Sequence, residues 1–100
     1  MEIIRDGSRV TFVADGRIDT YSAPRFAEAM ETALDGAEDL TLDFGKLEYI
    51  SSSGLRAVML AVKTMGRQGA MRIVNLSTEI YDVLATTGFT GVCDVEMKPE

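Results

Sequence analysis

Three consecutive serines followed by a glycine, at residues 51–54, are the part of the chain best suited to chemistry. A serine hydroxyl can accept a phosphoryl group, cap a helix or, beside a base, act as a nucleophile. Apolar residues at helical spacing follow directly, so these serines should lie at a helix N-terminus. Unpaired N–H groups and the positive end of the helix dipole would stabilise a phosphate there by about 0.3–1 kcal/mol. The segment is therefore a candidate phosphate site, although ordinary N-capping by one serine would explain the same residues.

Serine catalysis is disfavoured by the composition. The chain contains no histidine, which excludes His-dependent triads and HExxH zinc sites. Only Lys46, Lys63 or a carboxylate could activate a serine, and neither a Gly-x-Ser-x-Gly elbow nor a P-loop is present. Asp43 has no neighbours that resemble a metal ligand set, so we interpret it as structural. We expect a protein that is not an enzyme, with no catalytic residue, metal or cofactor.

The overall composition is that of a small folded domain. The chain has 100 residues, of which 46% are hydrophobic, and a net charge of −6. This charge disfavours direct nucleic-acid binding, because the phosphates would be repelled. No apolar run approaches the roughly 18–20 residues of a membrane span, and residues 1–6 lack the pattern of a signal peptide. We therefore expect a cytoplasmic protein.

Strand-type and helix-type patterns alternate along the chain and predict the order β-β-α-β-α-β-α-β. Such alternation indicates an α/β fold with a mostly parallel, mixed sheet, in which an N-terminal hairpin supplies one antiparallel strand. Helices would pack on the sheet through right-handed connections. We expect strands at residues 2–5, 9–14, 39–44, 71–74 and 92–97, and helices at residues 23–34, 55–66 and 78–87.

Turn residues mark the element boundaries. Asp-Gly at residues 6–7 predicts a hairpin, whereas Asp-Gly at residues 15–16 fits either a second hairpin or a distortion within one longer strand. Ser22 is a candidate N-cap for the first helix, which should end at residues 35–36. Functional groups in such sheets gather beyond the carboxyl ends of the parallel strands. Here those ends are expected at residues 15–21, 45–53 and 75–77.

Several short segments together carry a resemblance to a known family. In their order along the chain, they resemble the motifs of STAS domains, and most closely those of bacterial anti-sigma factor antagonists. The resemblance covers nearly the whole chain, which implies a single STAS domain over residues 1–100. The matching segments are Gly-Arg-Ile-Asp at 16–19, Leu-Asp-Phe at 42–44, Tyr-Ile-Ser-Ser-Ser-Gly-Leu-Arg at 49–56, Asn-Leu-Ser at 75–77, Val-Leu at 83–84 and Thr-Gly-Phe at 87–89.

The resemblance implies a partner-switching function. In that family the unphosphorylated antagonist binds an anti-sigma factor and frees a sigma factor. The anti-sigma factor is usually also a serine kinase with a histidine-kinase-like ATPase domain, and a serine phosphatase resets the switch. The matching phosphoserine is Ser52, with Ser53 or Ser51 as fallbacks, because Ser51 stands where many members have Asp. The alternative is a STAS scaffold or regulatory subunit in another assembly, such as a stress-signalling complex or a lipid-transport ATPase.

A partner surface can be predicted around the serines. Asp19 either orients the serine loop, or meets the partner, or is a turn carboxylate bonded to nearby N–H groups. At about 100° per residue, Arg56, Lys63 and Arg67 lie within about 40° of one another, and Leu60 lies at the edge of this basic face. Such a surface suits an acidic partner, although a single exposed leucine is also common. The residues expected to contact the partner are Asp19, Ser51, Ser53, Gly54, Arg56 and Leu60.

Overall fold

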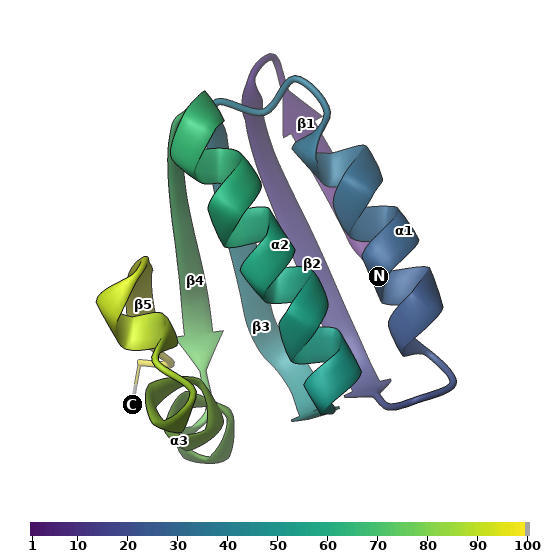
Figure 1. The fold of residues 1–100 in the computed structure, drawn as a ribbon, viewed down its shortest axis with the longest axis vertical. Coiled ribbons are helices and arrows are strands. Elements are labelled where there is room, and N and C mark those ends of the chain that lie inside the picture. The colour runs from purple at the N-terminus through teal and green to yellow at the C-terminus, as the bar shows by residue number, and fades with distance from the viewer. Residues whose placement is uncertain (100) are drawn as a thin grey trace.

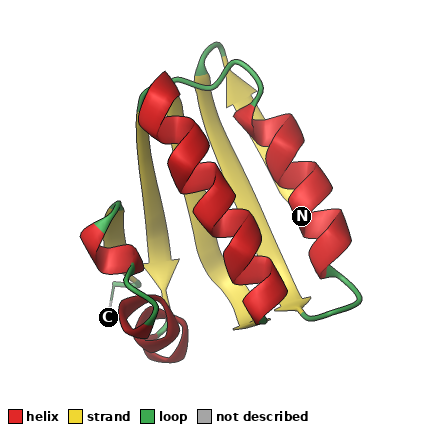
Figure 2. Ribbon diagram, in the orientation of Figure 1, coloured by secondary structure: helices red, strands yellow, loops and turns green. Residues whose placement is uncertain are grey.

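One five-stranded sheet organises the chain, and its strands follow one another across the sheet in sequence order. The computed structural model describes residues 1–99. β1 pairs antiparallel with β2, and the other neighbours pair in parallel, as predicted (Figures 1 and 2). The elements are β1 (Glu2–Asp6), β2 (Arg9–Ile18), α1 (Ala23–Leu34), β3 (Asp39–Ile50), α2 (Ser52–Gln68), β4 (Ala70–Leu76), α3 (Thr78–Thr86), a short 3₁₀ helix (Phe89–Gly91) and β5 (Asp94–Met97).

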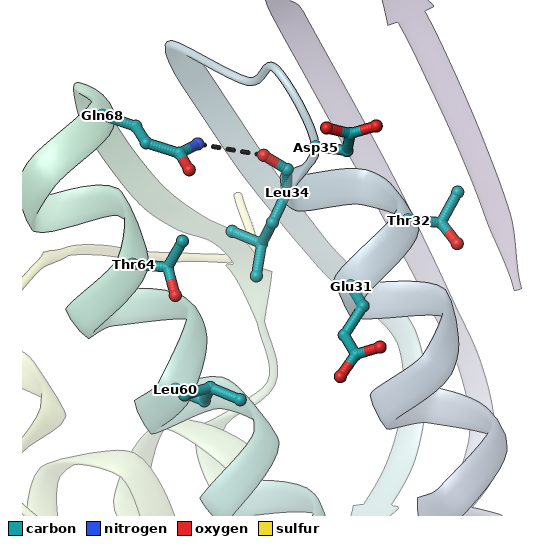
Figure 3. A pocket seen from close by; sticks show the side chains of 7 residues that line it. All are labelled: Glu31, Thr32, Leu34, Asp35, Leu60, Thr64 and Gln68. Atoms are coloured by element: carbon teal, nitrogen blue, oxygen red, sulfur yellow. Dashed lines mark hydrogen bonds between the residues drawn. The ribbon is translucent and has the colours of Figure 1, made fainter.

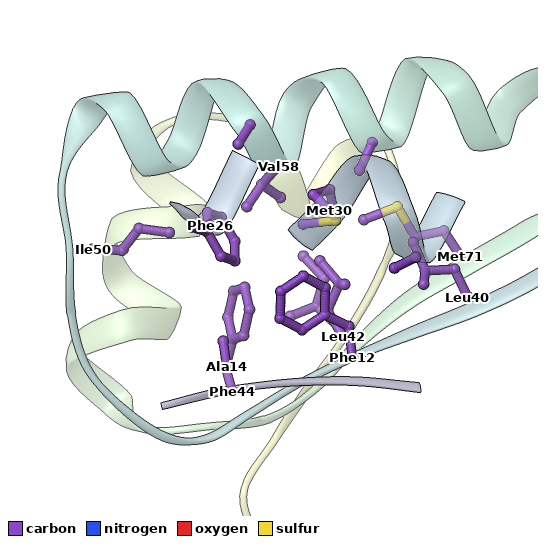
Figure 4. Packing of buried hydrophobic residues seen from close by; sticks show 14 of the residues in the cluster. Phe12, Ala14, Phe26, Met30, Leu40, Leu42, Phe44, Ile50, Val58 and Met71 are labelled. Atoms are coloured by element: carbon purple, nitrogen blue, oxygen red, sulfur yellow. The ribbon is translucent and has the colours of Figure 1, made fainter. Parts of the chain in front are cut away.

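Helices α1 and α2 lie side by side over one face of the sheet, and α3 lies near the end of β4 (Figure 1). Alternate residues of β2 and β3 point toward α1 and α2, as the period of two requires. The rings of Phe12 on β2 and Phe26 on α1 lie 5.5 Å apart at an interplanar angle of 55° (Figure 4). This packing makes one continuous core. On β2 and β3 its buried members include Val10, Phe12, Ala14, Leu40, Leu42 and Phe44.

Two central strands are longer than predicted. The Asp-Gly at residues 15–16 is a distortion within one strand, since the pairing of β2 with β3 shifts register there and Gly16 has a φ of +70°. β2 continues to Ile18 and β3 to Ile50, so the predicted strand ends at residues 14 and 44 were wrong. The buried residues Leu47 and Ile50 are three positions apart, because the irregular pairing breaks the alternation that marks a strand.

Other element boundaries also differ from prediction. Helix α2 begins at Ser52 rather than at residue 55, and β5 begins at Asp94 because a 3₁₀ helix that buries Phe89 precedes it. Ser22 is the N-cap residue of α1, as predicted, but its side chain makes no capping hydrogen bond to the helix.

The first turn of α2 rests directly on the ends of β2 and β3. A Cβ atom on Gly54 would lie 2.8 Å from Ile18 Cγ2 and 2.8 Å from Ile50 Cγ1. The Ser51 N–H donates to the Ile18 carbonyl at 2.7 Å, which joins the start of α2 to the last residue of β2. Only a glycine allows this close approach.

Replacement of Gly54 by Ala should therefore destabilise the fold. The added methyl group must displace two buried isoleucine side chains, and overpacking of this kind costs about 1–3 kcal/mol. Thermal or denaturant unfolding measures the loss. Gly66→Ala is the matched control in the same helix, because its Cβ would meet nothing within 4 Å. It should stabilise by about 0.5–1 kcal/mol. Equal effects at both positions would contradict the packing described here.

Candidate functional site

The candidate site lies where β2 and β3 end and α2 begins (Figure 1). The loop after β2 starts at Asp19, and the serine segment starts at Ser51, directly after Ile50. The hydrogen bond from the Ser51 N–H to the Ile18 carbonyl holds the two segments next to each other. The sequence-based placement of both at one edge of the sheet is thus confirmed.

The three serines have different environments. Ser51 is the N-cap of α2, since its Oγ accepts the Gly54 N–H at 3.3 Å and its carbonyl accepts the Leu55 N–H at 2.9 Å. Ser53 is half-buried. Ser52 is exposed, and within residues 1–99 its hydroxyl makes no hydrogen bond. Of the three hydroxyls, that of Ser52 is therefore the one most available to another protein.

The start of α2 is electrostatically suited to a negative group. The helix has no acidic residue in its first turn, and its first N–H groups have no partner within the helix. Because the dipole is positive at this end, a phosphate on Ser52 would be stabilised where it forms. The dianion would meet N–H donors without repulsion from a carboxylate in the same turn.

Asp19 is engaged by its own loop. Its Oδ1 accepts the N–H groups of Tyr21 and Ser22, both at 3.0 Å, so the turn-carboxylate interpretation is confirmed. The Ser22 hydroxyl accepts the Asp19 N–H at 2.9 Å and donates to the Arg17 carbonyl at 2.8 Å. The hydrogen bond from the Ser22 backbone lowers the pKa of Asp19, although partial desolvation opposes the shift. The charged carboxylate therefore stabilises the loop beside the serines through hydrogen bonds to its backbone.

Sequence reasoning missed two contributors to this loop. The hydroxyl of the N-cap residue Ser22 bonds to the Asp19 turn rather than to the N–H groups of α1, and the spacing of three residues between Asp19 and Ser22 is the signal that could have indicated it. The Arg17 guanidinium lies 4.5 Å from the centre of the Tyr49 ring. This cation–π contact between side chains joins β2 to β3 in addition to the backbone pairing. This pair could not be predicted, because the irregular register places the two residues opposite each other.

On the basic face of α2, Leu60 is exposed beside Arg56, Lys63 and Arg67, as predicted. Leu60 is 54% exposed, off the buried stripe of the helix, as expected. It lines an open hollow of about 430 Å³ together with Ser53, Arg56 and Lys63 of α2 and with Ala27 of α1. The serine segment and the basic face are therefore continuous parts of one surface.

Asp43 has a structural role, as predicted. Its Oδ1 accepts the Gly45 N–H at 2.9 Å and the Asn75 side-chain amide at 3.1 Å, which ties β3 to the end of β4. Over residues 1–99 no group of three or more potential metal ligands occurs. Within the same range, no helix has the length and apolar character needed to span a membrane.

Comparison with known protein families assigns the chain to one of them. A family model described as the STAS domain matches residues 1–99. The chain belongs to the STAS domain family. This STAS domain is 30% identical over 87 residues to BtrV of Bordetella bronchiseptica, provisionally named an anti-sigma factor antagonist, a match covering 85% of the chain and 75% of BtrV. It is 27% identical over 94 residues to an anti-sigma-B factor antagonist of Listeria monocytogenes, a match covering 92% of the chain and 82% of that relative.

Solved structures show the same fold. An anti-sigma factor antagonist from Mycobacterium paratuberculosis matches with a TM-score of 0.86 at 18% identity, over 95% of this STAS domain and 82% of that chain. The phosphorylated Bacillus cell fate determinant SpoIIAA matches with a TM-score of 0.73 at 16% identity, over 94% of this STAS domain and 88% of that chain. A sulfate transporter family protein from Wolinella succinogenes matches with a TM-score of 0.74 at 15% identity, over 95% of this STAS domain and 80% of that chain. Regulators and a transporter-family protein share the fold, so the fold alone does not define the function.

The charge of Asp19 should stabilise the STAS domain in a pH-dependent way. Because the pKa of Asp19 is lowered in the folded state, its contribution is present above the unfolded value near 3.8 and is lost as the pH falls through the folded value. In Asp19→Asn, the amide oxygen can still accept the same hydrogen bonds, but the side chain carries no charge. This variant should therefore melt below the wild type at pH 7.

The difference between the two melting temperatures should shrink as the pH is lowered from about 5 to about 3. Asp82→Asn is the control, since Asp82 is an exposed acid on α3. It should leave the melting temperature nearly unchanged at pH 7. If the melting temperature of Asp19→Asn stayed below that of the wild type by the same amount down to low pH, a charge-based role would be contradicted.

Proposed function

We propose that this STAS domain is an anti-sigma factor antagonist whose binding is switched by phosphorylation of Ser52. The observation that supports it best is the exposed hydroxyl of Ser52 at the N-terminus of α2, which has no hydrogen-bond partner within residues 1–99. The two curated relatives carry the name anti-sigma factor antagonist, and SpoIIAA has been solved in a phosphorylated form. The unmodified domain binds an anti-sigma factor in the cytoplasm and thereby frees a sigma factor.

The modifying enzyme is proposed to be the anti-sigma factor itself, acting as a serine kinase through a histidine-kinase-like ATPase domain. A serine phosphatase restores the unmodified state. Ser51 and Ser53 are poorer acceptors, because Ser51 caps the helix through its Oγ and Ser53 is half-buried. The order of accessibility thus supports Ser52, with Ser53 and Ser51 as the fallback sites.

Phosphorylation is proposed to release the partner by local charge. A phosphoserine adds about −1.5 to −2 charge at neutral pH. Within the domain, the N-terminal N–H groups of α2 can accept that charge, so the fold need not rearrange. A partner surface packed on Ser52 would instead bury a dianion, and desolvation without matched donors costs several kcal/mol. Each 1.4 kcal/mol lowers the affinity about tenfold, so partial desolvation is enough for release.

The proposed contact surface consists of two kinds of residue. Ser53, Arg56 and Leu60 offer side chains to the partner along α2. Asp19, Ser51 and Gly54 act through position: Asp19 braces the loop, Ser51 caps the helix, and buried Gly54 brings the helix onto the sheet. An acidic partner region would complement Arg56 at the centre of this surface.

Substitutions at Ser52 separate the two states of the switch. The anti-sigma factor recovered from the host with the wild-type domain is purified and titrated against each variant by calorimetry. Ser52→Asp should bind at least tenfold more weakly, because its carboxylate mimics part of the phosphate charge. Ser52→Ala should bind like the wild type and should not be released by ATP. Ser53→Ala is the matched control and should be released by ATP as the wild type is.

Mass spectrometry after incubation with the anti-sigma factor and ATP identifies the modified residue. The proposal requires phosphate on Ser52. Phosphate confined to Ser51 or Ser53, or no phosphate at all, would refute the assignment. Recovery of a transporter or scaffold assembly, without any anti-sigma factor, would refute the proposed function and support the alternative role.

A further inference from the structure

The outward face of the α1–α2 layer carries opposite charges on its two helices. α1 exposes Glu28 and Glu31, here called the acidic ridge, and α2 exposes Arg56, Lys63 and Arg67, here called the basic ridge. Over residues 1–99, no ion pair within 4.0 Å joins α1 to α2. The two ridges therefore run beside each other with their charges facing solvent.

A groove of mixed polar and apolar lining separates the two ridges, and Leu60 is the exposed apolar residue that its two hollows share. Leu60 lines the hollow of about 430 Å³ that contains Ala27 and Lys63. It also lines a second hollow of about 630 Å³ that contains Glu31 and Thr64. Figure 3 shows Leu60 on α2 and Glu31 on the facing helix α1. Glu31 and Lys63 thus both lie near the level of Leu60, on opposite sides of the groove.

This arrangement is complementary to itself. Both helices follow a parallel strand and run in the same direction (Figure 1). A two-fold axis parallel to the helices and along the groove would place the acidic ridge of each copy opposite the basic ridge of the other. It would bring the two Leu60 side chains together near the axis and set Glu31 opposite Lys63 of the second copy. An axis across the helices would instead oppose like charges.

We propose that two copies of this chain associate through their α1–α2 faces as a two-fold dimer with parallel helices. A small apolar centre within a charged rim is typical of a transient, salt-sensitive association. Arg56 and Leu60 also belong to the surface proposed for the anti-sigma factor, so the dimer must dissociate before that partner binds. Because the experiment below contains no anti-sigma factor, its result is independent of the function proposed above.

Sedimentation equilibrium of the full chain tests the association. Between about 5 µM and 1 mM protein, the mass should rise from the monomer value of 10.9 kDa toward twice that value. About 0.5 M NaCl should weaken the association several-fold, because it screens the ridge contacts. A constant monomer mass throughout would overturn the dimer and leave the face to other partners.

Charge reversals test the geometry. Glu31→Lys and Lys63→Glu should each weaken the dimer at least tenfold, because the symmetry doubles every new like-charge contact. The double variant Glu31→Lys/Lys63→Glu restores opposite charges across the axis and should recover most of the affinity. Leu60→Asp should abolish dimerisation. Glu96→Lys on β5 makes the same charge change away from both helices and should dimerise like the wild type.

The melting temperature of each variant shows whether the fold is intact. Dimerisation that survives Leu60→Asp, or a double variant no better than the single ones, would overturn the proposed interface.

Discussion

The contact between the first turn of α2 and the ends of β2 and β3 is the constraint on which the site depends. Gly54 has no room for a side chain between Ile18 and Ile50, and the Ser51 N–H is bonded to the Ile18 carbonyl. These contacts fix where the helix begins and therefore which serine is capped and which is exposed. A helix that began one residue later would place a different hydroxyl at the accessible position.

The two functions proposed for helix α2 depend on different parts of its geometry. Its N-terminus supplies unpaired N–H groups and a positive dipole end, which suit a phosphate on Ser52. Its exposed side supplies Arg56, Lys63 and Leu60, which suit contact with a protein. Because both lie on one rigid helix packed on the sheet, a charge added at Ser52 acts on the same surface that a partner would cover. No conformational relay through the core is required.

Much of the fold could be predicted because its periodic signals are strong. The stripes of α1 and α2 and the alternation in β2 predicted the element order and the edge of the sheet where the site lies. The second half of β3 could not be predicted, because the shifted register with β2 leaves Leu47 and Ile50 without strand periodicity. The pairing of Arg17 with Tyr49 depends on that same register.

At the site, residue types alone left alternatives open. A serine segment before a helix predicts a cap, and Ser51 is that cap. The local pattern does not distinguish Ser52 from Ser53, since both are serines in the first turn, and Ser52 came from the family resemblance. The difference in exposure between them arises from how α2 packs against the sheet and α1. Similarly, Ser22 looks like a helix cap in sequence, yet the Asp19 turn uses its hydroxyl.

We propose that a phosphate on Ser52 is accommodated locally, within a fold that does not rearrange. Amide NMR spectra of the free domain before and after phosphorylation test this most directly. We expect large shifts in the first turn of α2, at residues 51–56, and in the adjoining loop at Asp19, with β4 and β5 almost unchanged. Large shifts across β4 and β5, which are remote from the serine segment, would show a global rearrangement and contradict the local mechanism, even if partner binding were lost.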